Sequence, residues 1–118
     1  MRVLVCGSRG WTDYDAILHR LAQIKASRPT IVHGAASGAD TMADRAAKTL
    51  NLTVECYPAD WATYGKRAGF IRNEQMLDTG VGLVIAFWDG QSPGTAHLIQ
   101  CMRALGKPVV LVSSDTTA

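Results

Sequence analysis

The chain alternates short apolar runs with longer stretches in which apolar residues recur every three or four positions. Five runs are rich in β-branched and aliphatic residues and lack polar alternation, as is typical of parallel strands covered on both faces. They span residues 3–6, 30–33, 52–57, 82–88 and 109–112. Each stretch between them places its apolar residues on one face, which favours a helix. We therefore expect five strands and four helices in alternation.

Boundary signals support these elements. Asn51 and Gly80 stand where left-handed helix C-caps belong, and Gly106-Lys107-Pro108 ends the last helical stretch before the final strand. A β-α repeat with short connections implies a parallel sheet with right-handed crossovers and helices on both faces. The pattern predicts a Rossmann-like α/β three-layer sandwich with a five-stranded parallel sheet, formed as a single domain by residues 1–112. We expect the polar residues 113–118 to fray.

Composition narrows the function classes. The chain has 118 residues, 47% of them hydrophobic, which suits one folded domain, and its net charge of +2 is too weak for a nucleic-acid footprint. No His, Cys and Asp group has metal-ligand spacing, so we expect no metal site, and no resident cofactor is predicted. Cys6, Cys56 and Cys101 show no C-x-x-C spacing, and no apolar stretch fits a signal peptide or membrane span. We expect reduced thiols and a cytoplasmic protein without a membrane partner.

Glycine-rich turns follow several of the predicted strands, at the sheet edge where ligands bind in open parallel sheets. After the first strand comes Gly7-Ser8-Arg9-Gly10. Glycine lets the backbone approach a ligand closely, and backbone N–H groups near a helix start attract anions. A tight turn with a surface arginine explains this tetrapeptide equally well.

The turn after the second strand, residues 33–41, opens a helix with small residues that leave room for a phosphate or a ribose. Asp40 either caps the helix, its ordinary role, or bonds a ribose hydroxyl. His33 has no acid or nucleophile at a suitable spacing, so a core or supporting role is favoured over catalysis. The small residues placed in the candidate site are Gly34, Ala35, Ser37 and Gly38.

The third turn, residues 58–73, holds the densest cluster of polar and aromatic residues in the chain. Arg67 and Arg72 lie five positions apart and are placed to flank one anion near a helix start, with Asn73 beside them. Trp61 and Tyr64 either stack on a base or pack a long loop against the domain.

The fourth turn, residues 87–95, again enters a helix through glycine. Thr95 is predicted to be the helix N-cap and a phosphate donor, with Gly94 and Trp88 in the same turn. Helix N-termini combine unpaired N–H groups with the positive end of the dipole, so this is the most natural phosphate seat.

The four turns together carry a family resemblance, in the order in which they occur. The residues concerned are Gly7-Ser8-Arg9, His33-Gly34-Ala35-x-Ser37-Gly38-Ala39-Asp40, Asp60-Trp61, Gly65-Lys66-x-Ala68-Gly69, Arg72-Asn73-x-x-Met76 and Phe87…Gly94-Thr95. From residue 3 to about residue 110 the chain resembles the YspA-like (cpYpsA-related) branch of the SLOG superfamily, which is related to the lysine-decarboxylase-like LOG phosphoribohydrolases and to the DNA-processing protein A group. The resemblance implies a Rossmann-like fold, a nucleotide-derived ligand of the NAD or ADP-ribose type, a homodimer or higher homo-oligomer, and a bacterial or phage setting.

Two departures from the family pattern matter. LOG enzymes carry P-G-G-x-G-T-x-x-E, whose glutamate supports N-glycosidic cleavage, whereas Leu98 stands at that position here. Ala35 replaces the second glycine of the usual H-G-G-A, which predicts a slightly narrower pocket. The phosphate-binding Gly94-Thr95 pair is kept and the acid is not.

Three functions follow from these residues. The leading hypothesis is a protein that senses or sequesters a nucleotide-derived small molecule. The first alternative is a nucleotide N-glycosidase that uses a non-standard acid, for which the candidates are Asp40, Asp60, Glu74 and Asp89. The second is single-stranded nucleic-acid binding, which the weak net charge opposes.

Overall fold

The computed structural model describes residues 1–113 and shows a five-stranded, all-parallel sheet in the order β3-β2-β1-β4-β5. The strands are β1 Arg2–Gly7, β2 Thr30–His33, β3 Thr53–Cys56, β4 Leu83–Trp88 and β5 Val109–Ser113. Every predicted strand is present, and each boundary lies within one residue of its prediction. Ser113 closes β5, so that residue of the expected frayed tail is part of the sheet, and residues 114–118 lie outside the described residues.

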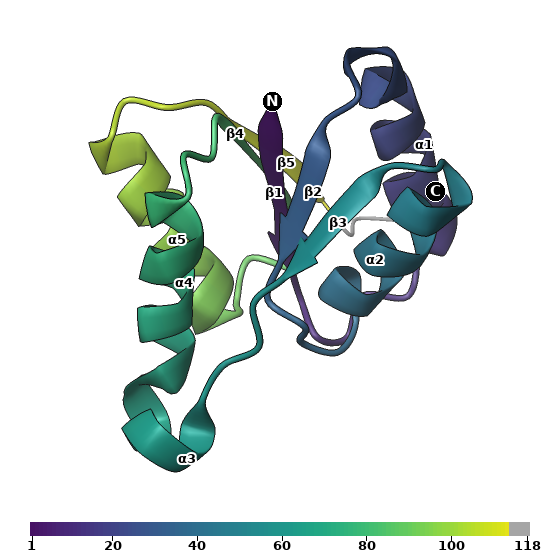
Figure 1. Ribbon diagram of the computed structural model, residues 1–118. Coiled ribbons are helices and arrows are strands. Elements are labelled where there is room, and N and C mark those ends of the chain that lie inside the picture. Colours follow the sequence, from purple (N-terminus) through teal and green to yellow (C-terminus); the bar gives the residue numbers. More distant parts are fainter. Residues whose placement is uncertain (114–118) are drawn as a thin grey trace.

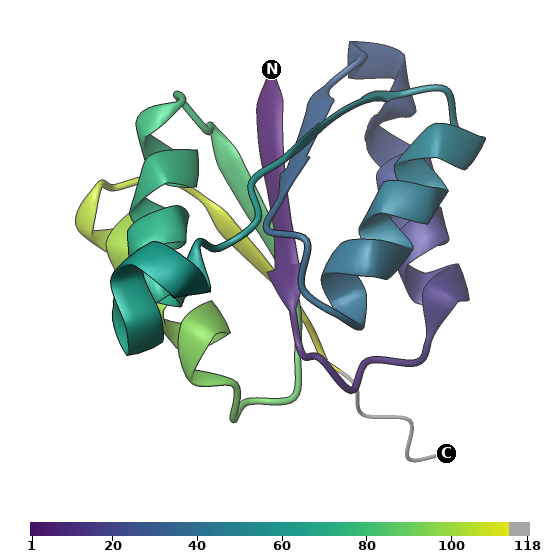
Figure 2. The same cartoon turned by 60° about the horizontal axis from the view of Figure 1, so that its bottom comes forward.

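Helices cover both faces of the sheet (Figure 1). Helices α1 (Tyr14–Ile24) and α2 (Ala39–Thr49) lie on one face, and α4 (Ala68–Asp78) and α5 (Pro93–Ala104) lie on the other. Figure 2 shows the same three layers from a second angle. The fold class and the four helices predicted from the sequence are confirmed. The sequence pattern did not predict a further, four-residue helix, α3 (Trp61–Tyr64), or the 3₁₀ turns η1 (Lys25–Ser27) and η2 (Gly65–Arg67).

The sheet separates two apolar cores, which explains why the strands lack polar alternation. Val3 and Val5 of β1 pack in the cluster beneath α1 and α2, whereas Leu4 and Cys6 pack in the cluster beneath α4 and α5. Successive side chains of a strand point to opposite faces, so a central strand covered twice needs apolar residues at every position. Phe87, which is fully buried, anchors the first cluster edge-on against Trp11, with ring centroids 5.5 Å apart.

The helices end as the sequence predicts, through residues in the left-handed region. Asn51, Gly80 and Gly106 have φ of 59°, 91° and 70°. Glycine and asparagine tolerate this conformation best, so it ends each helix abruptly and turns the chain back toward the sheet.

The topology places a crevice between β1 and β4. These two strands are neighbours, with Gly7 in register with Phe87, yet the helices that follow them cover opposite faces. Where the connecting helices change from one face of the sheet to the other, a gap opens at the carboxyl ends of the strands. Ligands of doubly wound sheets usually bind in this gap. The register His33↔Cys56 brings the ends of β2 and β3 to the same edge.

A polar cluster ties the outer strand β3 to the middle of the sheet on the α4 side. Arg2 donates to both carboxylate oxygens of Glu55, at 2.8 and 2.5 Å, and through Nε to Thr79 at 3.2 Å. Tyr57 donates to Glu55 at 2.8 Å. The hydrogen bonds from Arg2 and Tyr57 lower the pKa of Glu55 to about 2 from an ordinary 4.5.

This shift predicts a pH-dependent effect of Glu55→Gln. A folded pKa below the unfolded value adds stability above about pH 4.5 and loses it as the pH falls toward about 2. The variant should therefore unfold at a lower urea concentration than the wild type at about pH 6, and the gap should shrink by about pH 3. Glu74→Gln, on an exposed part of α4, is the control. A gap that stays constant with pH would contradict this account.

In the loop between β2 and α2, Ala35 adopts a backbone conformation that is unfavourable for alanine. Ala35 has φ of 59°, in the left-handed region, and its side chain is exposed. Outside glycine this region costs on the order of 1–2 kcal/mol per residue, because Cβ crowds the carbonyl oxygen. The next residue, Ala36, does not have a positive φ.

Ala35→Gly should therefore raise the free energy of unfolding by about 1 kcal/mol, because glycine adopts this conformation without strain. Ala36→Gly is the matched control and should lower it by up to about 1 kcal/mol through backbone entropy. Urea titration of both variants gives the two values. Equal changes in the two variants would show that Ala35 carries no strain.

Candidate functional site

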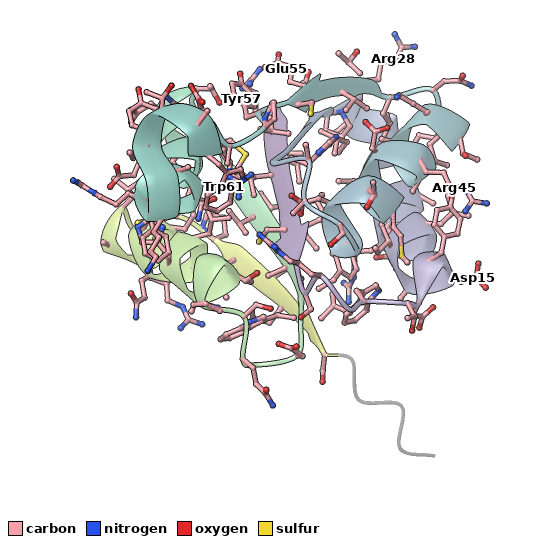
Figure 3. All side chains as sticks on the ribbon, turned by 90° about the horizontal axis from the view of Figure 1, so that it is seen from below. Asp15, Arg28, Arg45, Glu55, Tyr57 and Trp61 are labelled. Carbon is pink, nitrogen blue, oxygen red and sulfur yellow. The ribbon has the colours of Figure 1, made fainter. Side chains whose placement is uncertain are left out.

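A pocket of about 340 Å³ opens in the crevice between β1 and β4, bounded by α4 and the start of α5. Figure 3 looks onto this carboxyl edge of the sheet. The predicted site residues that line the pocket are Gly7, Arg9, Asp40, Arg72, Asn73, Gly94 and Thr95. The first, second, third and fourth turns each contribute at least one of them, so the fold brings all four turns together.

The other predicted site residues do not line the pocket. They are Ser8, Gly34, Ala35, Ser37, Gly38, Trp61, Arg67 and Trp88. Ala35, Ser37 and Arg67 are exposed, so Ala35 does not narrow the pocket as its substitution for glycine had suggested. Ser8, Gly34 and Gly38 instead support the residues that do line it.

Further lining residues lay outside the predicted set. They are Cys6, Gly10, Ala36, Met76, Asp89, Ser92, Pro93 and Leu98. Most adjoin a predicted residue in the same turn, and Met76 lies one helical turn after Asn73. The sequence could have indicated these residues by their adjacency to predicted site residues, or by helical spacing from them, but not by their chemical type. Burial raises the pKa of the Cys6 thiol, so this side chain is a neutral wall of the pocket.

Ser8 joins the turns that form the pocket. Its backbone N–H donates to the Phe87 carbonyl at 2.9 Å, and its own carbonyl accepts from Ala39 N–H at 3.2 Å. Its buried hydroxyl accepts from Asp89 N–H at 2.8 Å. One small residue thus ties the end of β1 to the start of α2 and to the turn after β4.

Two glycines allow this close approach. A Cβ at Gly7 would collide with the Phe87 carbonyl oxygen, and a Cβ at Gly38 would collide with the backbone carbonyl of Arg9. Gly38 also has φ of 75° as the N-cap of α2. Both glycines are needed for the turns to pack against each other.

Asp40 is buried in the first turn of α2, and the expectation that it caps this helix is wrong. Oδ2 accepts the backbone N–H of Gly34 at 3.0 Å and of Ala36 at 3.3 Å, so the carboxylate caps the preceding loop rather than the helix. Oδ1 has no hydrogen-bond partner within residues 1–113 and belongs to a pocket-lining side chain. Burial raises the pKa of Asp40 above its ordinary value, although the two amides and the nearby charge of Arg72 oppose this.

Arg72 is the half-buried cation of the pocket. Nη1 donates to the Gly34 carbonyl and, at 3.5 Å, to the Tyr57 carbonyl, and Nε donates to Asn73 Oδ1 at 3.0 Å. Within the described chain no carboxylate forms a salt bridge with it. Burial lowers the pKa of Arg72, and the charge of Asp40 raises it in part. Neutral oxygens therefore orient this guanidinium without neutralising it.

Asn73 connects Arg72 to the start of α5. Its Nδ2 donates to the Gly94 carbonyl at 3.1 Å and to His97 Nδ1 at 3.3 Å. The N-cap of α5 is Ser92, with Pro93 at the first helical position, so the prediction that Thr95 caps this helix is wrong. Proline at the first helical position shifts the start upstream of Thr95, because its fixed φ suits that place. Thr95 is buried in the first turn and still lines the pocket.

His33 contacts an acid, Asp44, so the expectation that no acid lies at a suitable spacing from it is wrong. It is buried at the end of β2, where Nδ1 accepts Ala35 N–H at 3.0 Å and Nε2 lies 2.9 Å from Asp44. An accepting Nδ1 leaves the proton of the neutral ring on Nε2, which donates to the carboxylate. His33 therefore positions the loop that holds Asp40.

The acids proposed for the N-glycosidase alternative are not equally placed. Asp40 and Asp89 line the pocket, whereas Asp60 caps α3 by accepting Thr63 N–H at 3.1 Å, and Glu74 is exposed on α4. Leu98, at the position of the LOG glutamate, lines the pocket and is 3% exposed. An apolar side chain therefore faces the space where LOG enzymes have a carboxylate.

No group of three or more His, Cys, Asp and Glu side chains within residues 1–113 is arranged to hold a metal ion. No helix in that range has the length and apolar character needed to cross a bilayer. The three cysteines are free.

Solved structures with similar folds confirm the architecture. DNA processing protein A of Streptococcus pneumoniae aligns with a TM-score of 0.78 at 17% identity over 98% of this chain and 51% of its own. TM1055 aligns with a TM-score of 0.73 at 20% identity over 92% of this chain and 71% of its own. DNA processing protein A of Helicobacter pylori, described for its single-stranded DNA binding mode, gives 0.71 at 16% identity over 99% of this chain and 67% of its own. At these identities the likeness shows the fold alone.

Sequence relatives identify the family. The Gene 61 protein of Mycobacterium phage D29 is 39% identical over 117 residues, which cover 92% of this chain and 94% of the phage protein. Residues 1–64, which carry the first and second turns and reach α3, match the YspA, cpYpsA-related SLOG family. This chain belongs to the YspA, cpYpsA-related SLOG family.

Proposed function

We propose that the pocket binds the phosphate of a nucleotide-derived small molecule, of the NAD or ADP-ribose type, and that the protein senses or sequesters this ligand. Arg72 carries the proposal. Its guanidinium is half-buried, fixed in orientation by neutral oxygens and without a carboxylate partner in the described chain. A desolvated cation held in this way gains from a bound anion, because the ligand supplies the charge that the protein omits.

The start of α5 supplies the second half of the phosphate seat. The first N–H groups of a helix have no partner within the helix, and the dipole places partial positive charge beside them. Gly94 and Thr95 lie in this first turn and line the pocket together with Arg72 and the exposed Arg9. Two arginines and a helix N-terminus thus border one space.

Asp40 supplies an acceptor for the sugar. Its Oδ2 is occupied by two backbone amides, and Oδ1 is left for a ribose hydroxyl. A pocket of about 340 Å³ falls within the range of roughly 300–1,000 Å³ that is usual for small-molecule sites. Leu98 favours binding over cleavage, because it provides no carboxylate to stabilise an oxocarbenium-like transition state.

Arg9→Ala tests the phosphate seat. Arg9 is exposed and makes no side-chain hydrogen bond within residues 1–113, so its loss should leave stability unchanged. Losing one charge-assisted contact should weaken binding about tenfold, or roughly 1.4 kcal/mol. Isothermal titration with AMP, ADP-ribose, cyclic ADP-ribose and NAD measures the effect.

The matched control is Arg103→Ala, which removes an exposed arginine from the opposite end of α5 and should not change affinity. If folded wild-type protein binds none of the four compounds, the proposed function is wrong. Native mass spectrometry of protein from its own host would report a co-purified ligand and the proposed homo-oligomer in one measurement.

A second candidate function is cleavage of a nucleotide N-glycosidic bond. Asp40 favours it, because its carboxyl lines the pocket and burial raises its pKa, which is the direction that a general acid requires. Asp89 is less suited, because its pKa is lowered by hydrogen bonds from the backbone N–H groups of Gln91 and Ser92.

Release of free base from AMP, followed by chromatography, tests this candidate. If Asp40 is the acid, Asp40→Asn should reduce the rate by about 100-fold or more, whereas Asp89→Asn should change it much less. Asparagine keeps an oxygen to accept the Gly34 and Ala36 amides, so the loop should stay in place. Turnover that persists in Asp40→Asn would exclude Asp40 as the acid.

A further inference from the structure

Trp61 is unusually exposed for a tryptophan. The residue is 51% exposed, although it lies in a helix, α3. Asp60 caps the start of α3 through its carboxylate, and Gly65, with φ of 59°, closes its end. The ring is therefore held at the carboxyl edge of the sheet on a short, capped helix rather than buried in a core.

The ring lies beside the cation of the pocket. The place that a Cβ on Gly69 would occupy is 3.5 Å from Trp61 Cη2 and 3.9 Å from Arg72 Nη2. Because Gly69 has no side chain, the indole edge and Arg72 Nη2 border the same small space. Figure 3, which looks onto the carboxyl edge of the sheet, labels Trp61 beside α3.

Another exposed aromatic residue, Phe70, has a ring partner of its own. Phe70 is 46% exposed, and its ring contacts His97 at a centroid distance of 4.5 Å, on α5. Neither Phe70 nor His97 lines the pocket. Phe70 is therefore similar to Trp61 in exposure but already contacts another ring, so it serves as the control.

We propose that Trp61 stacks on the nucleobase of the ligand, so that the site selects a base-bearing nucleotide over a sugar phosphate. This inference rests on the proposed phosphate site, since it places the base on the side of Arg72 away from the start of α5. A ring beside a phosphate-binding arginine offers a flat apolar face to a base, and every base can use it. The site would then discriminate weakly between different bases but strongly between ligands that carry a base and ligands that lack one.

The experiment compares AMP and ADP-ribose with ribose 5-phosphate, which has the sugar and phosphate but no base. Wild-type protein should bind the adenine nucleotides at least about tenfold more tightly than ribose 5-phosphate, the lower range of a base–aromatic stack. Trp61→Ala should remove this difference and leave the affinity for ribose 5-phosphate unchanged. Trp61→Phe should keep most of the difference, and the control Phe70→Ala should keep all of it.

The outcomes separate the two proposals. If wild-type protein binds ribose 5-phosphate and the nucleotides equally, or if Trp61→Ala keeps the preference for a base, the stacking role is wrong while the phosphate site stands. If wild-type protein binds none of the three probes, both proposals fail. If a folded Trp61→Ala loses ribose 5-phosphate as well, Trp61 supports the pocket generally and the stacking role is overturned.

Discussion

The arrangement of the pocket depends on the close packing of three turns around Ser8. Its N–H, its carbonyl and its hydroxyl bind, respectively, the end of β4, the start of α2 and the turn that leads to α5. The approach is possible only because Gly7 and Gly38 carry no Cβ where a backbone carbonyl lies. Packing at this one residue places the dipole ends of two helices on opposite faces of the sheet beside the same crevice.

The strands could be predicted almost to the residue because each inner strand is buried on both faces. A run such as residues 3–6 sends alternate side chains into two different cores, so its sequence is continuously apolar. Helix α3 could not be predicted in this way. Its four residues are too few to show a periodic stripe, and its stability comes from the cap at Asp60 and the turn at Gly65.

The candidate site shows what chemical type alone cannot decide. Arg67 and Arg72 offered the same chemistry five positions apart, but Arg67 ends the η2 turn and is exposed, whereas Arg72 lies within α4 and lines the pocket. Tertiary contacts also decide the role of each glycine, because some glycines line the pocket and others only allow the turns to pack. Gly94 does the first and Gly38 the second, and nothing in their local sequences distinguishes them.

The chemistry of the pocket follows from an uneven distribution of charge. Arg72 is held by carbonyl and amide oxygens, and Asp40, the carboxylate whose charge raises the pKa of Arg72, already accepts two backbone amides. The positive charge is therefore oriented toward the pocket without being neutralised there, while Leu98 keeps the adjoining wall apolar. These features are the basis for proposing a phosphate-bearing ligand, and the site offers no carboxylate at the Leu98 position to assist the departure of a base.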